Sequence, residues 1–433
     1  MAFDPDVIIL YFSEAFSLIK FKLLMGLSAA LLVAVLGATL SAKRFMTVPV
    51  LLPSLVFLCV STLSTFSSDK ILHSLLGETR RHDGLLSLAA GVLLFYAAAR
   101  FLDSWAKVRI FVVAGVTSAI IIATYGIVQH FGMDPVPDRG IPWYSGVRAF
   151  STLGHPIWLA AYLTLMMGAA LILYFRTGAK WERWLWLAAI AVMAACWLYT
   201  STRGAMLGVG VAGPMLFLLA HRRFGSVRPM LLPVGVVVVA LILAQLANPQ
   251  STDLFTRFDA ANLATSPEEM PEGGDLSVMV RLLMWRDSVP VILERPLIGH
   301  GPDSLAEPFK RYEGEDLRAF FPDGQVIDKA HNELLQVAAT TGLLGLAAYL
   351  WIFVSYFRHA YKSGGWPLLA PSGGVLAYIL QLQTAFTTIA TGVTFWAILG
   401  VTVAIMRIQE RETPAALREQ DAGQQKAPGW FSV

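Results

Sequence analysis

Arginine and histidine side chains recur in short segments between apolar stretches, and several of these segments contain glycine. The segments read GETRRHDG (77–84), GVRAFSTLGHPIWLA (146–160), TSTRGAML (200–207), VMVRLLMWRDSVPVIL (278–293), IGHGPDSL (298–305) and KAHNELLQ (329–336). Their arginines and histidines are Arg80, Arg81, His82, Arg148, His155, Arg203, Arg281, Arg286, His300 and His331. Arginine grips a phosphate with two parallel hydrogen bonds, so the group predicts a preformed anion pocket. Any one arginine could instead reach a lipid phosphate by snorkelling.

The composition places these segments in a membrane protein. Of the 433 residues, 56% are hydrophobic and only 15% are charged, and the mean hydropathy is +0.59. Soluble domains have about a quarter charged residues, so lipid is the expected solvent. The formal net charge of +3 and the absence of a recognisable motif argue against nucleic acid as a partner. Cys59 and Cys196 lie inside apolar runs and suit packing rather than a disulfide.

Apolar stretches long enough to cross about 30 Å of hydrocarbon recur along the chain. The sequence predicts an all-α integral membrane protein with eleven spans, at 24–41, 47–66, 84–100, 110–131, 156–175, 184–200, 204–220, 230–247, 333–357, 367–385 and 388–407. Residues 7–22 are apolar but contain Glu14 and Lys20, so they are either a twelfth span or an interfacial helix.

The lysines and arginines between the spans predict the orientation, because short cytoplasmic loops hold an excess of them. One alternating set of loops is rich in basic residues: Lys43, Arg44, Arg100, Lys107, Arg109, Arg176, Lys180, Arg183, Arg222, Arg223, Arg228, Arg358 and Lys362. The other set therefore faces outward, at 67–83, 132–155, 200–203, 248–332 and 386–387. We expect a multi-pass bacterial inner-membrane protein whose site faces the periplasm, with the side of the N-terminus left open.

The longest outward segment, 248–332, predicts a periplasmic loop domain between membrane helices 1–247 and 333–407. Its 85 residues carry fifteen acidic and eight basic side chains, and a connection of this length should have its own structure. Residues 266–275 suggest flexibility, whereas 278–293 have apolar residues at helical spacing and predict an amphipathic helix. The tail, 408–433, is charged and predicts a disordered cytoplasmic segment.

Four of the quoted regions, in their order along the chain, resemble the O-antigen ligase superfamily of integral-membrane glycosyltransferases. They are LGHPIWLA (153–160), TSTRGAMLG (200–208), VRLLMWRDSVPVILERPLIGHGPDSL (280–305) and KAHNELLQVAATTGLLG (329–345). The number of spans and the late, large outer loop fit the same superfamily. One position departs from it, since Ile157 stands where relatives often have asparagine.

The resemblance implies transfer of a glycan from undecaprenyl pyrophosphate to an acceptor hydroxyl on the periplasmic side. In the ligase branch, which acts in lipopolysaccharide biosynthesis, the acceptor is a sugar of lipid A-core. Other branches polymerise repeat units or glycosylate proteins with the same type of donor. Besides donor and acceptor, membrane lipids are the expected partners.

The resemblance also implies roles for individual residues. Arg203 and Arg281 match the family's arginine positions and would bind the donor pyrophosphate, where fixed cations stabilise the charge that develops as the glycosidic bond breaks. Arg80 and Arg81 are second choices for the same phosphates or for an acidic acceptor. His331 matches the family's proton acceptor.

Other residues near these positions are secondary candidates, namely Arg148, His155, Arg286, His300, Asp328 and Glu333. His155 and His300 suit hydrogen bonds that shape glycine-rich loops. His331 is expected in the first turn of the ninth span, where the positive end of the helix dipole favours a neutral ring. Asp328 would orient it by the i, i+3 spacing of a helix. Helix capping is the structural alternative for His331, and Glu333 is the next candidate base.

Two further expectations concern metal ions and transport. The outer loops contain no Asp-x-Asp pair of the kind that holds a divalent ion at a pyrophosphate, and Asp4-Pro5-Asp6 stands alone near the terminus, so we expect neither metal nor cofactor.

A transporter of a lipid-linked glycan or an anion is the alternative from another class. It would show an internal repeat and ionisable residues at mid-membrane, neither of which is evident. Gln381 and Gln383 suit packing between helices.

Overall fold

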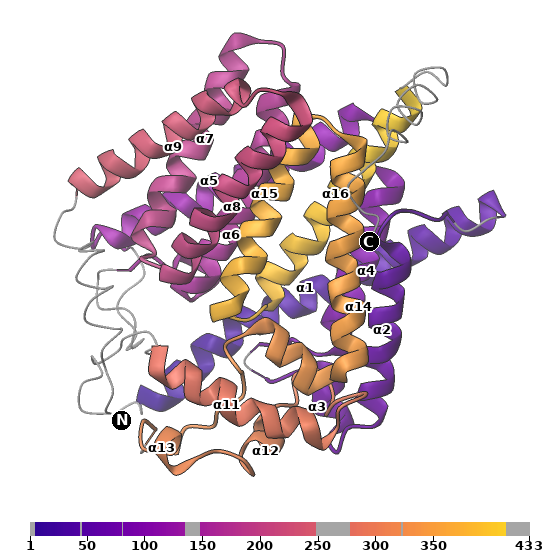
Figure 1. Ribbon diagram of the computed structural model, residues 1–433, viewed down its shortest axis with the longest axis vertical. Helices are drawn as coiled ribbons and strands as arrows, with labels where there is room; N and C mark the ends of the chain where they lie inside the picture. Colours follow the sequence, from indigo (N-terminus) through magenta and orange to yellow (C-terminus); the bar gives the residue numbers. More distant parts are fainter. Residues whose placement is uncertain are drawn as a thin grey trace, which may run out of the picture.

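The computed structural model is a bundle of long helices with a cap of short helices at one end (Figure 1). It describes residues 5–43, 46–79, 81–134, 148–247, 278–321 and 324–412, with side chains from residue 17 onward. Within these ranges every regular element is helical, so the predicted all-α class is confirmed.

Each of the eleven predicted spans falls on a helix. These helices are α1 (Pro5–Ala42), α2 (Leu51–Phe66), α4 (Leu85–Phe101), α5 (Trp105–His130), α6 (Pro156–Arg176), α7 (Lys180–Tyr199), α8 (Arg203–Phe224), α9 (Arg228–Ala247), α14 (Glu333–Ser363), α15 (Trp366–Gln381) and α16 (Ile389–Glu412). Eight of them are long and apolar enough to cross a membrane. The remaining three, α2, α4 and α15, have 16 or 17 residues. The chain is therefore a multi-pass membrane protein.

The prediction of a separate element at 7–22 was wrong. Residues 5–42 form one uninterrupted helix of 38 residues, so 7–22 continue the first span. The charges that suggested a break do not end a helix, because glutamate and lysine both have good helix propensity.

The bundle has a buried centre and a rim of exposed apolar side chains. Its central helix is α16, which packs against α4, α6 and α14, and 78% of its most apolar window is buried, against 11% for α1 and 17% for α9. Leucine and valine side chains on α1 and α9 are exposed. Such surfaces are unfavourable in water and stable in lipid.

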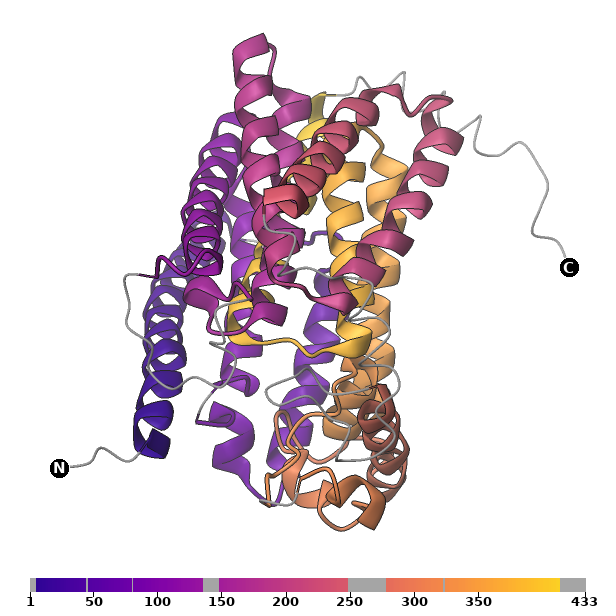
Figure 2. The ribbon, with the colours of Figure 1, turned by 90° about the vertical axis from the view of Figure 1, so that its left-hand side faces the viewer.

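The short elements gather at one end of the bundle, as two perpendicular views agree (Figures 1 and 2). They are α3 (Ile71–Leu76), α11 (Val278–Glu294), α12 (Ala306–Phe309) and α13 (Glu315–Arg318). The predicted amphipathic helix is thus confirmed as α11, which buries Val280, Leu283 and Val291 in a small core of its own with α12 and α13. Two 3-10 turns, η1 (Ser151–Leu153) and η3 (Leu382–Thr384), complete the elements. The predicted flexible segment 266–275 lies outside the described residues, as does the tail beyond 412.

Helix α14 is interrupted in its N-terminal third. Gly342 has φ 70° and ψ −180°, a backbone conformation that glycine adopts most easily. The interruption releases amide groups from the helical ladder, and the amide of Leu343 donates to the carbonyl of Pro296 at 2.7 Å. Residues 296–301, which follow α11, therefore run directly beside the break.

The same segment satisfies carbonyl groups before the break. The amides of His300 and Gly301 donate to the carbonyls of Ala339 and Thr340 at 3.1 and 2.8 Å, respectively. The hydroxyl of Ser64 on α2 also donates to the Thr340 carbonyl at 2.7 Å. Residues 296–301 thus hold the α11–α13 cap to α14, and Ser64 joins α2 to the same carbonyl of α14.

We expect Gly342→Ala to lower the thermal stability of the purified protein. A Cβ at this position would overlap the backbone of Leu297 and Ile298, and the positive φ adds strain of roughly 1–3 kcal/mol. Gly210→Ala in α8 is the matched control, because a Cβ there meets nothing within 4 Å. An unfolding midpoint in detergent equal to that of Gly210→Ala would contradict the packing described for the break.

Candidate active site

The cap and the adjacent helix ends, which the sequence predicts to face outward, border a charged cavity of about 850 Å³, here called the outer cavity. Arg81, His300, Asp328 and His331 line it, together with Ser68, Asp69, Lys70, His73, Glu78, Ser304, Ala306, Glu307, Pro308, Lys310, Gln325 and Val326. Four of the residues predicted from the sequence therefore meet in one place. The cavity is large enough for a sugar, because ligand pockets usually span about 300–1,000 Å³.

Arg81 and Asp328 form an ion pair on the wall of the outer cavity. The Arg81 Nε also lies 4.0 Å from the Asp83 carboxylate, and its guanidinium carbon lies 5.6 Å from the centre of the Phe386 ring. Arg81 is thus held by groups from three segments. Arg80, its neighbour and a second-choice phosphate ligand, lies outside the described residues.

His331 lies before α14 rather than in its first turn, so that prediction was wrong. The helix begins at Glu333, and the side chain of Asn332 caps it by accepting hydrogen bonds from the amides of Leu334 and Leu335. His331 itself has a left-handed backbone, with φ 49°. Since residues 328–331 are not helical, the i, i+3 argument for Asp328 also fails. Asn332, not His331, is the cap.

Arg203 and Arg281 line one small pocket, which we call the arginine pocket. Arg203 is the first residue of α8 and Arg281 lies in the first turn of α11, so the structure brings together two residues that are 78 positions apart. Ile157, Thr202, Gly204, Gln381, Thr384 and Ala385 complete the lining. The Gln381 amide donates to the Ile157 carbonyl at 2.9 Å, which fits the packing role expected for Gln381.

The connection between α15 and α16 links the arginine pocket to His331, which lines the outer cavity. Thr384 and Ala385 face the arginine pocket. The next residue, Phe386, contacts the His331 ring edge to face, with ring centres 5.1 Å apart. Asn332 donates from its side-chain amide to the Gln383 carbonyl at 3.2 Å. The same short segment thus lines the pocket of the two arginines and contacts the histidine.

Three of the secondary candidates have structural partners. The Nδ1 of His155 accepts a hydrogen bond from the Ile157 amide at the start of α6. The buried His300 ring lies 3.1 Å from the Val291 carbonyl, and burial lowers its pKa. Arg148 donates to the Thr200 carbonyl at 3.0 Å. The loop-shaping role expected of His155 and His300 agrees with these contacts.

Arg286 connects α11 to α13 and lines neither the outer cavity nor the arginine pocket. Its guanidinium donates two hydrogen bonds to Asp316, at 2.6 and 2.8 Å, and one to Asp287 at 2.6 Å. The hydrogen bond from Arg286 lowers the pKa of Asp316 to about 2. These contacts indicate that Arg286 stabilises the packing of α13 on α11 within the cap.

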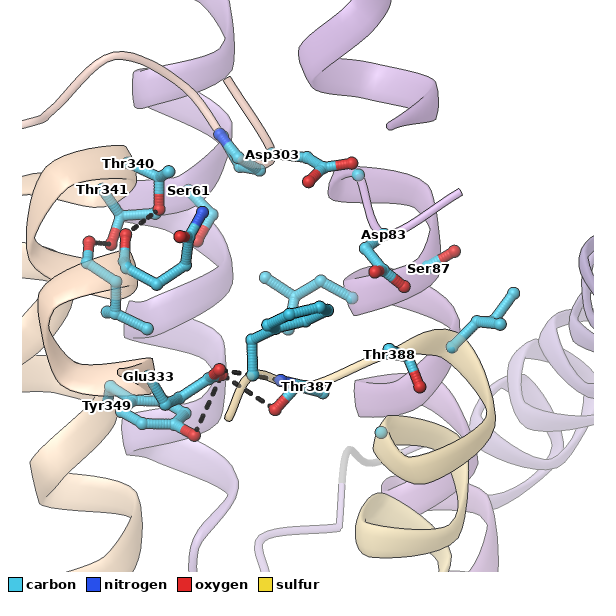
Figure 3. A pocket seen from close by; sticks show the side chains of 18 of the residues that line it. Ser61, Asp83, Ser87, Asp303, Glu333, Thr340, Thr341, Tyr349, Thr387 and Thr388 are labelled. Carbon is cyan, nitrogen blue, oxygen red and sulfur yellow. Dashed lines mark hydrogen bonds between the residues drawn. The ribbon is translucent and has the colours of Figure 1, made fainter. Parts of the chain in front are cut away.

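Glu333 lies in a second, smaller cavity of about 140 Å³, here called the inner cavity. Its carboxylate accepts hydrogen bonds from the amide and hydroxyl of Thr387, both at 2.8 Å, and from the Tyr349 hydroxyl at 3.4 Å (Figure 3). These bonds fix the start of α14 to the connection before α16. Such a carboxylate suits positioning better than proton transfer to a substrate.

Sequence reasoning missed a buried group of charges, which we call the buried charge cluster: Asp83, Asp303 and Lys329. The Lys329 ammonium lies 2.5 Å from the Asp303 carboxylate and 3.9 Å from that of Asp83. Figure 3 shows Asp83 and Asp303 at one end of the inner cavity, away from Glu333. Each residue stands in a quoted segment, but beside arginines and histidines whose chemistry is more conspicuous. The only signal in the sequence was a lysine in an outward loop.

The carboxyl groups of this cluster differ in their pKa. Burial raises the pKa of Asp83 to about 7, against the opposing effect of Lys329. Burial also acts to raise the pKa of Asp303, but the positive charges of Lys329 and Arg81 outweigh it and the pKa falls below its ordinary value. Asp303 is therefore the ionised partner of Lys329.

The fold and the site define a multi-pass helical membrane protein with a charged site at one end of its bundle. A family model described as O-antigen ligase matches residues 188–350, which contain Arg203, Arg281 and His331. This match confirms the resemblance to the O-antigen ligase superfamily and supports glycosyltransferase activity of that family. No curated protein matches the chain.

Proposed function

We propose that the protein is an O-antigen ligase of the bacterial inner membrane. It transfers a glycan from undecaprenyl pyrophosphate to a sugar hydroxyl of lipid A-core, at a site that faces the periplasm. Residues 278–321 and 324–332, the described part of the outward loop 248–332 between membrane helices 1–247 and 333–407, form the cap over this site.

The observation that carries the proposal is the placement of Arg203 and Arg281 in one pocket, whose lining residue Ala385 directly precedes the Phe386 that contacts His331. Two guanidinium groups suit a pyrophosphate, because each offers a planar fork of donors to phosphate oxygens. The outer cavity, with its carboxylates and basic side chains, suits a hydroxyl-rich acceptor. Donor and acceptor would then meet beside Phe386.

In the proposed reaction the acceptor hydroxyl oxygen attacks the anomeric carbon of the donor sugar. A new carbon–oxygen bond forms there as the bond to the pyrophosphate oxygen breaks. His331 takes the hydroxyl proton, and the pyrophosphate leaves with the bonding electron pair. Arg203 and Arg281 stabilise the negative charge that it gains. Arg81, which is paired with Asp328, positions the acceptor side of the cavity.

Deletion of the gene tests the acceptor, with lipopolysaccharide analysed on gels. Loss of the long O-antigen ladder with an intact core supports ligation. A single repeat unit on the core would indicate a polymerase, and unchanged lipopolysaccharide with altered glycoprotein would indicate transfer to protein. Unchanged glycans of every kind would favour the transport alternative.

We expect transfer to continue without a divalent metal ion. Arginines take the place of the ion as neutralising charges in the arginine pocket, and the outer loops lack an Asp-x-Asp pair. Purified enzyme treated with EDTA should keep its initial rate in a detergent assay. A loss that magnesium or manganese restores would overturn this prediction and direct attention to the acidic residues of 303–328.

A further inference from the structure

The buried charge cluster joins three segments that are distant in sequence. Lys329 and Asp303 have 5% and 1% of their side chains exposed, and Asp83 has 10%. A second carboxylate oxygen of Asp303 accepts from the Glu78 amide at 2.6 Å. These contacts join three segments in the interior of the protein: residues 78–83, the loop after α11 that contains Asp303, and the residues just before α14.

The cluster is directly connected to the residues proposed for the reaction. Lys329 is two positions before His331, and its ammonium lies 5.4 Å from the centre of the Phe386 ring, which contacts His331 on its edge. Asp83 faces Arg81. The contacts of Lys329 with Asp303 and Asp83 therefore also restrict the positions of His331 and Arg81.

Backbone strain gathers around the same cluster. His82, Asp303 and His331 all have left-handed backbones, with φ of 55°, 57° and 49°. Such conformations cost about 1–3 kcal/mol each and persist only where the surroundings hold them. For His331 the holding groups are on both sides, Lys329 before it and the capping Asn332 after it.

Stability alone does not account for a buried ion pair. Removing two charges from water costs several kcal/mol for each ion, and apolar side chains of similar volume often give an equally stable protein. A buried pair can nevertheless fix one geometry where packing alone would allow several. That effect is useful where a proton acceptor must face its substrate.

We propose that Lys329 is a positioning residue for glycan transfer, and that its bond to Asp303 holds His331 and Arg81 in the geometry that the reaction needs. This inference rests on the proposed function. Lys329 does not touch the substrate in this proposal, and it acts through the backbone of 328–331 and through Phe386.

The test compares Lys329→Met with Lys329→Met/Asp303→Asn in a purified transfer assay. The single variant leaves Asp303 without its partner, so both stability and rate should fall. The double variant removes that uncompensated charge, while the oxygen of the substituted side-chain amide can still accept from the Glu78 amide, so the unfolding midpoint should recover. The kcat should stay about 10–100-fold low, since a 1 Å misplacement costs up to about 10²-fold, whereas KM for the donor should not change.

A second measurement does not depend on activity. Modification of His331 by diethyl pyrocarbonate, followed site by site with mass spectrometry, should become faster in the double variant because the segment is less restrained. Arg318→Met and Arg318→Met/Glu313→Gln are the matched controls, since this pair is joined at 3.1 Å in the cap with the arginine 63% exposed. Neither control should alter kcat or the modification of His331.

The outcomes separate this inference from the proposed function. Wild-type kcat in the stable double variant, or unchanged modification of His331, would show that the pair only balances charge and would overturn the positioning role. If wild-type protein transfers no glycan from a lipid-linked donor, the proposed function itself fails. An active wild type with an equally active Lys329→Met variant would reject the inference alone.

Discussion

His331→Ala should lower the turnover of glycan transfer by about 10²–10⁴-fold, the usual contribution of a positioned general base. His331 lies on the wall of the outer cavity, next to the segment that borders the arginine pocket. The variant should still fold and bind the donor, because Asn332 caps α14 without the imidazole. Initial rates with purified lipid-linked donor measure the effect. The wild-type rate should also fall at acid pH, where a protonated imidazole cannot accept a proton.

His359→Ala is the matched control for this variant. His359 belongs to the last turns of α14, far along the helix from the cap, and its Nδ1 lies 2.7 Å from the Ser355 carbonyl. It should leave the rate unchanged. Added imidazole should partly restore activity to His331→Gly, in which it can occupy the vacated space. Full activity of a folded His331→Ala variant would instead make Asp328 and then Glu333 the next candidate bases.

Arg281→Ala and Arg203→Ala should each lower kcat by about 10²–10³-fold, as expected when one charge-assisted contact to a developing anion is lost. Lysine at either position should restore little, because an ammonium group lacks the planar fork of guanidinium. The double variant should lose less than the sum of the two free-energy losses, since residues that share one ligand are coupled. Single-turnover rates with purified donor give these values.

Arg286→Ala separates the donor effect from a general effect on the cap. Arg286 lies on the same helix as Arg281, but its partners are Asp287 and Asp316. Its loss should lower the stability of the cap and leave donor-dependent kcat near that of the wild type at permissive temperature. If Arg281→Ala and Arg286→Ala behave alike, Arg281 has a structural role and the pyrophosphate assignment is lost.

Much of the bundle could be predicted from the sequence because a bilayer imposes a length and a composition on each span. The same apolar counting could not detect that 7–22 belong to the helix of the first span, α1, since a charged residue does not by itself end a helix. Amphipathic spacing was sufficient for α11, whose apolar side chains build the core of the cap.

The candidate site was predictable in its residues but not in its connections. Positive charge in outward loops identified Arg81, Arg203 and Arg281, and the structure places the last two in one pocket. The predicted span begins at 333, as α14 does, but His331 was wrongly placed in its first turn, although Asn332 is a common capping residue. Lys329 and Asp303 are distant in sequence and form a buried ion pair only in the folded protein. Neither residue stands in a local sequence pattern that predicts burial.

The interruption of α14 has a consequence for exchanging parts between relatives. Residues 296–301 complete the backbone hydrogen bonding of 339–344. The cap and the N-terminal third of α14 therefore have to be exchanged together. A chimaera that takes its cap from another protein but keeps its own α14 would break this pairing and leave backbone groups unsatisfied near the membrane surface. Acceptor preference should therefore be transferable only when residues 296–301 and 339–344 are moved together.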